Sequence, residues 1–174
     1  MSLLPDKIFN TFEDLTVDFL KSEGIEALIV DVDNTLIPYE ETDPRPAVLK
    51  WINELTEAGI ALSFVTNNHK HRLQYFNRNL NFPAYHDSFK PFLYNMKKAM
   101  RAMGSTIENT ANVGDQILTD IWAGKRLGVK TYLVPPIRDK RDPFTRFKRW
   151  LEKPILKKYY KREAEKQKEE QSRG

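Results

Sequence analysis

A short apolar run that ends in two aspartates constrains the fold of this chain more than any other stretch. Residues 27–30 read Ala-Leu-Ile-Val, and Asp31 and Asp33 follow directly. A continuous apolar run of this kind is typical of a central strand that is covered on both faces. In a parallel α/β sheet, ligands bind at the carboxyl ends of the strands. The sequence therefore predicts such a sheet, with both acids at its binding edge.

An isolated Asp-x-Asp pair is open to three interpretations. The two carboxylates could divide a reaction, one meeting an electrophile and the other serving the leaving group. They could instead be solvated loop acids, which is the commoner case for an isolated pair. A calcium loop would need an acidic group at position 5 and a glutamate at position 12, where Thr35 and Thr42 stand, so we exclude it.

Length and composition narrow the class of protein. A chain of 174 residues suits one compact domain, and a second full domain is not expected. The absence of cysteine excludes disulfides, thiol nucleophiles and cysteine-based zinc sites, and it fits a reducing cytosolic compartment. His69 and His71 stand two positions apart at an expected helix start and would point to different faces, so we expect surface residues rather than metal ligands.

The chain shows no secretory signal at its start and no stretch of about 20 apolar residues that could span a bilayer. We therefore expect a cytoplasmic protein that is soluble or peripheral to the membrane. Residues 138–174 hold 14 Lys and Arg against 7 Asp and Glu, whereas residues 1–137 hold 14 against 17. We expect residues 1–137 to form the core, including an amphipathic N-terminal segment. Residues 138–174 would form a basic aromatic extension, partly helical or disordered.

Strand and helix signals alternate along the first 137 residues. Strands are expected at residues 27–30, 60–65, 84–86, 110–113 and 131–134. Apolar residues at helical spacing predict helices in the intervals between them. The alternation predicts an α/β fold with a parallel sheet of about five strands and helices on both faces. Residues 1–25 are expected to be partly helical, packed on the sheet or lying on a membrane surface.

The expected strand ends carry a set of polar side chains. These are Asp31, Asp33, Thr66, Asp115 and, just beyond, Asp120. Lys90 stands at the expected start of a helix. Carboxylates that hold a divalent cation, with a hydroxyl and an ammonium that neutralise phosphoryl oxygens, suit a phosphorylated substrate. Two plainer alternatives stay open, because Thr66 could cap the next helix and Lys90 could be a surface lysine.

Four motifs in this order resemble those of the haloacid dehalogenase (HAD) phosphatase superfamily. They are Asp-x-Asp-x-Thr-Leu at residues 31–36, Thr66 at a strand end, Lys90, and Gly-Asp-x-x-x-x-Asp at residues 114–120. The resemblance covers about residues 26–136 and implies a three-layer, Rossmann-like HAD fold, with residues 1–137 as the phosphatase core. The wording Asp-Val-Asp-Asn-Thr-Leu and Val-Gly-Asp-Gln-Ile-Leu-Thr-Asp-Ile is closest to subfamily IIIA, the YqeG-type branch. That branch is similar to phosphatases of phosphatidylglycerophosphate.

The resemblance implies a role for each residue of these motifs. Asp31 would be the nucleophile that attacks phosphorus and forms an aspartyl-phosphate. Asp33 would protonate the leaving oxygen and then activate the water that cleaves the intermediate. Thr66 and Lys90 would hold phosphoryl oxygens.

The resemblance also implies a Mg²⁺ site. Asp115 would join the Asp31 carboxylate and the Asp33 backbone carbonyl around the ion. Asp120 would reach the ion through water.

The spacing of the motifs leaves no room for a substantial cap domain, which many members of this superfamily carry. Asp31 and Thr66 are 35 positions apart, Thr66 and Lys90 are 24 apart, and the expected helices fill most of both intervals. An uncovered site excludes little water and grips little of a small substrate. It therefore suits a phosphate presented on something large.

The basic extension is open to three uses. Residues 138–162 hold 11 Lys and Arg against three acids, interleaved with aromatic residues. Such a segment is attracted to an anionic membrane, which we favour, or to nucleic acid. Alternatively, its aromatic residues cover the sheet edge. Pro154 is expected to interrupt its helix, and residues from about 163 onward are expected to fray or be disordered.

We therefore favour a Mg²⁺-dependent phosphomonoester hydrolase at the cytosolic membrane face, with phosphatidylglycerophosphate as the substrate that the resemblance implies. The first alternative is the same chemistry on a soluble metabolite or a nucleic-acid end. The second is a partner- or RNA-binding protein with a vestigial site. The intact acids at positions 31, 33, 115 and 120 argue against the second.

Overall fold

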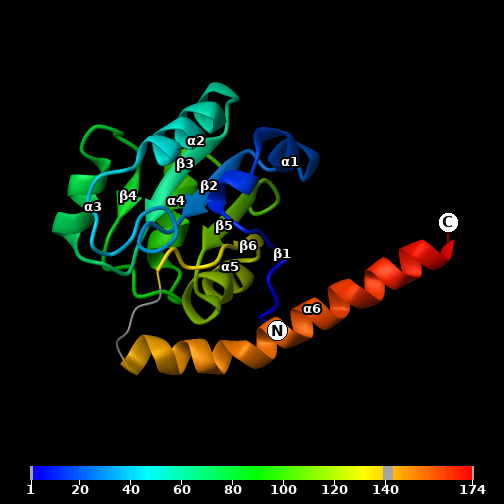
Figure 1. Cartoon of the computed structure of the whole chain (residues 1–174). Helices are drawn as coiled ribbons and strands as arrows, with labels where there is room; N and C mark the ends of the chain where they lie inside the picture. The colour runs from blue at the N-terminus through cyan, green and yellow to red at the C-terminus, as the bar shows by residue number, and fades with distance from the viewer. Residues whose placement is uncertain (1, 139–142, 174) are drawn as a thin grey trace.

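Six parallel strands form the sheet of the computed structural model, which describes residues 2–138 and 143–173. Their spatial order is β1-β6-β5-β2-β3-β4 (Figure 1). In chain order the strands are β1 (Lys7–Ile8), β2 (Ala27–Val30), β3 (Ala61–Val65), β4 (Ala84–Tyr85), β5 (Thr110–Gly114) and β6 (Lys130–Leu133). The prediction of a parallel α/β sheet is confirmed, with six strands rather than about five.

Helical segments lie in the connections between the strands, and one long helix follows the last strand. In chain order they are η1 (Phe12–Asp14), α1 (Val17–Ser22), α2 (Pro46–Glu57), α3 (Lys70–Asn77), α4 (Tyr94–Met103), η2 (Ile117–Ile121), α5 (Trp122–Leu127) and α6 (Pro143–Arg173). The predicted alternation of strand and helix is therefore confirmed.

The side chains of β2 divide between two apolar cores. Leu28 and Val30 belong to the larger core, to which α1, α2 and α3 contribute. Ile29 belongs to the second core, with residues of α4 and α5 such as Met96 and Ala123. Because successive strand residues point to opposite faces, helices cover both sides of the sheet. The molecule thus has the expected three layers (Figure 1).

The sixth strand comes from the N-terminal segment. β1 pairs with β6, Lys7 lying level with Tyr132. The Asp6 carboxylate fastens this edge by accepting hydrogen bonds from the Thr131 N–H at 2.8 Å and the Thr131 hydroxyl at 2.9 Å. A strand of two residues has no periodicity, so the sequence pattern could not predict it. Farther along, η1 and α1 provide the expected helix, and the buried Leu20 packs α1 against the sheet.

α6 is one continuous helix, so the predicted interruption at Pro154 is wrong. Proline removes the hydrogen bond that the Trp150 carbonyl would otherwise accept. Trp150 and Pro154 both lie on the exposed side of the helix, where water can bond to that carbonyl instead. The helix continues to Arg173, and its C-terminal part extends away from the sheet (Figure 1).

No cap domain covers the sheet within residues 2–138 and 143–173. The β2–β3 connection holds a loop and α2, and the β3–β4 connection holds α3. The prediction of no substantial cap is therefore confirmed. None of the helices in these two ranges combines the length and the apolar content that crossing a bilayer requires.

Candidate active site

Adjacent strands bring the predicted residues to one edge of the sheet. β2 lies between β3 and β5, and Val30 is level with Val113 of β5. Asp31, the next residue after β2, donates its N–H to the Val113 carbonyl at 2.9 Å. Thr66 follows β3 and Asp115 follows β5, so residues far apart in the sequence meet at the carboxyl ends of the strands.

A tight turn after β2 directs Asp31 and Asp33 to different partners. Asn34 has a φ of 65°, a left-handed conformation that asparagine tolerates better than most residues. The Thr35 hydroxyl then lies 3.1 Å from Asp31 Oδ2 and 3.5 Å from Asp115 Oδ1. The Thr35 hydroxyl thus contacts both carboxylates and helps to fix their positions.

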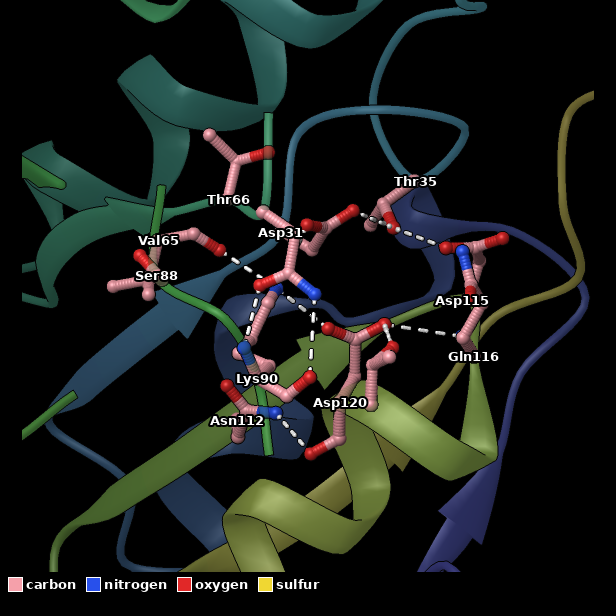
Figure 2. A network of polar contacts seen from close by, with 12 residues as sticks. Asp31, Thr35, Val65, Thr66, Ser88, Lys90, Asn112, Asp115, Gln116 and Asp120 are labelled. Carbon is pink, nitrogen blue, oxygen red and sulfur yellow. Dashed lines mark hydrogen bonds and ion pairs between the residues drawn. The ribbon is translucent and has the colours of Figure 1, made fainter. Parts of the chain in front are cut away.

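Asp31, Asp115 and Asp120 form a buried cluster of carboxylates (Figure 2). One oxygen from each lies within 4.8 Å of the others, and none of the three residues is more than 7% exposed. Closely spaced carboxylate oxygens suit a hard divalent cation, so this donor set fits the expected metal. The side chain of Asp33 lies outside the cluster, whereas Asp120, expected to act through water, belongs to it.

η2 is a single π-helical turn that carries Asp120 back toward the strand ends. The N–H groups of Asp120 and Ile121 both donate to the Gln116 carbonyl, at 2.9 and 3.2 Å. Asp120 Oδ2 in turn accepts from the Gln116 N–H at 3.1 Å. Such turns are rare and often mark functional sites.

Lys90 is buried within this arrangement, so the surface-lysine alternative is wrong. It is 5% exposed, and its Nζ donates to Asp31 Oδ1 at 2.8 Å, Asp120 Oδ1 at 2.6 Å and the Val65 carbonyl at 2.7 Å (Figure 2). The Asn67 side chain fixes the Lys90 backbone, accepting from its N–H at 2.6 Å and donating to its carbonyl at 3.3 Å. Each of the three N–H groups of the ammonium therefore has an acceptor within the site.

Burial and like charge shift the pKa values of these groups. Burial raises the pKa of Asp31 well above its ordinary value, with Lys90 opposing the shift and Asp120 and Asp115 adding to it. Burial and Asp120 raise the pKa of Asp115 to about 7, while the charge of Arg149 opposes this. Burial alone would lower the pKa of Lys90, but Asp120 and Asp31 outweigh it and raise that pKa. Lys90 is therefore a cation within a group of acids.

Thr66 contacts Asp33 and does not cap a helix. Its hydroxyl donates to Asp33 Oδ2 at 3.0 Å, and α3 begins at Lys70 after its N-cap residue His69. The capping alternative is therefore wrong. Arg72 of α3, which the sequence pattern did not single out, pairs with Asp33 Oδ1. An arginine in a polar helix gives no signal of where its side chain points.

Two further residues reach the site from α6, and the sequence pattern did not single them out either. Arg149 contacts Asp115, and Glu152 is 2% exposed beside the start of η2. A signal existed in one case, since Glu152 is the one acid among eight Lys and Arg in residues 143–162. An acid in so basic a segment indicates a specific partner.

The site opens into a pocket of about 180 Å³, and its lining includes Asp31, Asp33, Thr66, Lys90 and Asp120. A larger hollow of about 400 Å³ near the start of β2 contains none of these residues, so size alone does not mark the site. Pockets for whole small molecules usually measure about 300–1,000 Å³. The smaller pocket therefore suits a phosphoryl group better than an entire metabolite.

Comparison with known proteins decides the family. A family model of haloacid dehalogenase-like hydrolases matches residues 6–128. The chain belongs to this family. The resemblance of the motifs to the HAD superfamily is thereby confirmed. One relative of this HAD hydrolase, the "Probable phosphatase YqeG" of Bacillus subtilis (strain 168), is 34% identical over 153 residues, which are 88% of this chain and 89% of the relative.

Solved structures share the HAD fold of this chain. CbbY of Rhodobacter sphaeroides, in complex with xylulose-(1,5)bisphosphate, matches with a TM-score of 0.56 at 16% identity, over 69% of this chain and 90% of CbbY. The cobalt-bound deoxy-D-mannose-octulosonate 8-phosphate phosphatase YrbI of Haemophilus influenzae matches with a TM-score of 0.53 at 18% identity, over 66% and 70%. These likenesses confirm the predicted fold.

Proposed function

We propose that this HAD hydrolase is a Mg²⁺-dependent phosphomonoester hydrolase that works through an aspartyl-phosphate on Asp31. The arrangement around Asp31 carries the proposal. Asp31 lines the pocket, Lys90 Nζ lies 2.8 Å from its Oδ1, and the carboxylates of Asp115 and Asp120 lie beside it. The name of the Bacillus subtilis relative supports the same reaction class.

In the first step, an Asp31 oxygen attacks phosphorus and the bond from phosphorus to the leaving alcohol oxygen breaks. Asp33 gives its proton to that oxygen. The Thr66 hydroxyl donates a hydrogen bond to Asp33 Oδ2 and so orients this acid. Thr66 also lines the pocket that receives the phosphoryl group. Lys90 holds Asp31 in place and adds positive charge where negative charge develops.

In the second step, water attacks the phosphorus of the aspartyl-phosphate and Asp33 takes a proton from that water. The bond from Asp31 to phosphorus breaks, which releases phosphate and restores both carboxyl groups. Mg²⁺, held by Asp31, Asp115, Asp120 and the Asp33 carbonyl, would supply positive charge that stabilises the negative phosphoryl group.

The substrate that fits this site best is a phosphate on a large or membrane-bound molecule, with phosphatidylglycerophosphate as first candidate. Support comes from the small pocket and from the lack of a cap over it in the described part of the chain. The outer face of α6 exposes aromatic residues among basic ones, with Phe144 69% and Trp150 62% exposed. Such a face suits an anionic bilayer, so the enzyme would act at the cytoplasmic membrane surface.

A phosphate-release screen in Mg²⁺ tests this proposal. It compares phosphatidylglycerophosphate in mixed micelles with nucleotides, sugar phosphates and 5′-phosphorylated oligonucleotides. We expect the lipid to be hydrolysed fastest and EDTA to stop the reaction. Asp31→Asn should lower the rate by about 10³-fold or more, because it removes the nucleophile. Asp43→Asn, the same change at an exposed acid that pairs with Arg78, should keep the wild-type rate.

Two results would refute parts of the proposal separately. Full activity in Asp31→Asn, or no release from any of these compounds, would refute the phosphatase mechanism. Faster release from a soluble metabolite or an oligonucleotide end would refute the lipid substrate and leave the mechanism intact.

A further inference from the structure

We infer that α6 completes the active site, with Arg149 and Glu152 as positioning residues that fix the metal ligand Asp115. The inference rests on the metal site of the proposed function. It goes beyond that function because α6 lies outside residues 6–128, which match the family. The four family motifs therefore do not contain every residue that shapes this site.

One side of α6 is fastened to the core. Its buried and half-buried residues recur at helical spacing and include Arg149, Glu152, Ile155, Leu156 and Tyr159. Ile155 and Leu156 pack against Ile117 and Ile121 of η2, the turn that also carries Asp120. The helix is thereby anchored on the turn that supplies one of the clustered carboxylates.

Arg149 holds both the backbone and the side chain of Asp115. Its Nη1 donates to the Asp115 carbonyl at 2.6 Å, and its Nη2 donates to Asp115 Oδ2 at 2.5 Å. The Asp115 side chain is 0% exposed, so bulk water does not compete with Arg149 for hydrogen bonds to this carboxylate. A planar guanidinium that bonds two atoms of one residue restricts rotation of the carboxylate. Oδ1 then stays on the side of Thr35, which lies 3.5 Å away.

Glu152 ties the same turn of α6 to the start of η2. Its Oε1 accepts from the N–H groups of Ile117 and Leu118 at 2.8 and 3.2 Å. N–H groups in the first turn of a helix have no partner within that helix. Oε2 accepts from Arg149 Nη1 at 3.2 Å, so the charge of the half-buried arginine is balanced by two acids, Asp115 and Glu152. The loop between Asp115 and η2 is therefore held at both ends.

Isothermal titration with MgCl₂ tests the inference without any turnover. We expect Arg149→Gln to weaken Mg²⁺ binding about 10- to 100-fold, as loss of a partner behind a metal ligand commonly does. Arg149→Lys keeps the charge without the planar fork, so we expect only partial recovery. Glu152→Gln keeps an oxygen for the two N–H groups and should weaken binding less than Arg149→Gln.

Arg146→Gln is the matched control, because it removes the same charge from an exposed position of the same helix. It should bind Mg²⁺ as the wild type does. The rise in Tm on adding Mg²⁺ gives a second readout, and circular dichroism shows which variants fold. Should Arg149→Gln not fold, Arg149→Lys and Glu152→Gln carry the same comparison.

Three results would overturn the inference. The first is a folded Arg149→Gln that binds Mg²⁺ as tightly as the wild type. The second is tighter binding in that variant, which would make Arg149 a competitor of the ion. The third is full recovery in Arg149→Lys, because charge alone would then suffice.

The same measurements separate this inference from the proposed function. A chain that binds Mg²⁺, loses affinity in Arg149→Gln and releases no phosphate would support the inference and refute the phosphatase. A chain that releases phosphate, with unchanged Mg²⁺ affinity in the variant, would do the reverse. A wild-type chain that binds no Mg²⁺ would refute both.

Discussion

Gly114 shows how closely the residues of the site are packed. A Cβ at this position would lie 2.3 Å from Asp120 Cγ and 2.5 Å from its Oδ2. The absence of a side chain lets Asp120 fold back and accept the hydrogen bond from Lys90 at 2.6 Å. The glycine of the Gly-Asp motif therefore serves a contact and not a backbone turn.

We expect Gly114→Ala to destabilise the chain by about 1–3 kcal/mol, as overpacking in a core usually does. Phosphate release should fall about tenfold or more, because Asp120 must move away from Lys90. Urea unfolding and a rate assay measure the two effects. Gly104→Ala is the control, since its Cβ would meet nothing within 4 Å while its φ of +65° still strains the backbone. It should lose stability and keep its rate, and equal rates in both variants would contradict the packing argument.

Asp6 makes the stability of the chain depend on pH. Burial raises its pKa, but hydrogen bonds from Lys125 and Thr131 outweigh burial and hold that pKa below its ordinary value. A lowered folded-state pKa gives stability that is present above the unfolded pKa of about 3.9. That stability is lost as the pH falls through the lower, folded value.

We therefore expect Asp6→Asn to be less stable than the wild type at neutral pH and the difference to shrink below about pH 4. Thermal unfolding measured from about pH 2 to pH 7 tests this. Asp18→Asn, a change at an acid in the first turn of α1, serves as the comparison. A stability difference for Asp6→Asn that does not vary with pH would rule out the ion pair as its cause.

Among the elements, α6 is a long helix that contains an internal proline, Pro154. Pro154→Ala would restore an N–H that can donate to the Trp150 carbonyl, and alanine is favoured over proline in a helix interior by about 3 kcal/mol. We expect a higher Tm and slower amide hydrogen exchange on both sides of position 154, measured by mass spectrometry. Lys153→Ala adds an alanine beside it without adding an N–H and should change exchange little. Exchange in Pro154→Ala as fast as in the wild type would mean that the helix is not continuous there.

Apolar pattern predicts some elements far better than others. β2 and β3 carry mainly apolar runs, β5 and β6 mix apolar and polar residues, and the predicted bounds of all four central strands differ from the observed ones by one residue at most. β1 is held by bonds from Asp6 to a residue more than a hundred positions away, and no local pattern reveals such a partner. The course of α6 depends on a seam of few apolar residues within a mostly charged sequence.

The site was predictable to the extent that its residues stand inside motifs. Asp31, Lys90 and Asp115 come together as expected, because the order of strands in a parallel sheet fixes where their ends meet. Arg72 and Arg149 lie on helices, and their partners depend on how each helix is rotated against the core. Spacing along the chain does not report that rotation.

At the scale of the whole molecule, charge is divided between the core and the extension. Residues 138–174 carry a net charge of +7 and the first 137 residues a net −3. Each Lys or Arg near an anionic bilayer contributes about 1 kcal/mol to the free energy of binding. Salt screens this attraction beyond about 10 Å at 0.1 M ionic strength. The extension, with its exposed aromatic side chains, therefore directs any attraction to one side of the molecule.

We expect the chain to co-sediment with phosphatidylglycerol vesicles and to release them as salt is raised. Trp150→Ala and Phe147→Ala should weaken binding, because these stacked side chains are exposed on α6. Tyr75→Ala, at an exposed aromatic residue of α3, should not. Equal binding to neutral vesicles, or none at about 0.1 M salt, would contradict a membrane role for this face.

The position of Arg149 in the chain has a consequence for biosynthesis. A ribosome makes every strand of the sheet before it reaches α6, so the nascent core can collapse while the guanidinium that grips Asp115 has not yet been added. At about 5–20 residues per second, that interval lasts on the order of a second or more. A chain truncated before Arg149 would keep the three clustered carboxylates and lose the guanidinium that holds Asp115. A quality-control system that recognises only an unfolded core would therefore not remove it.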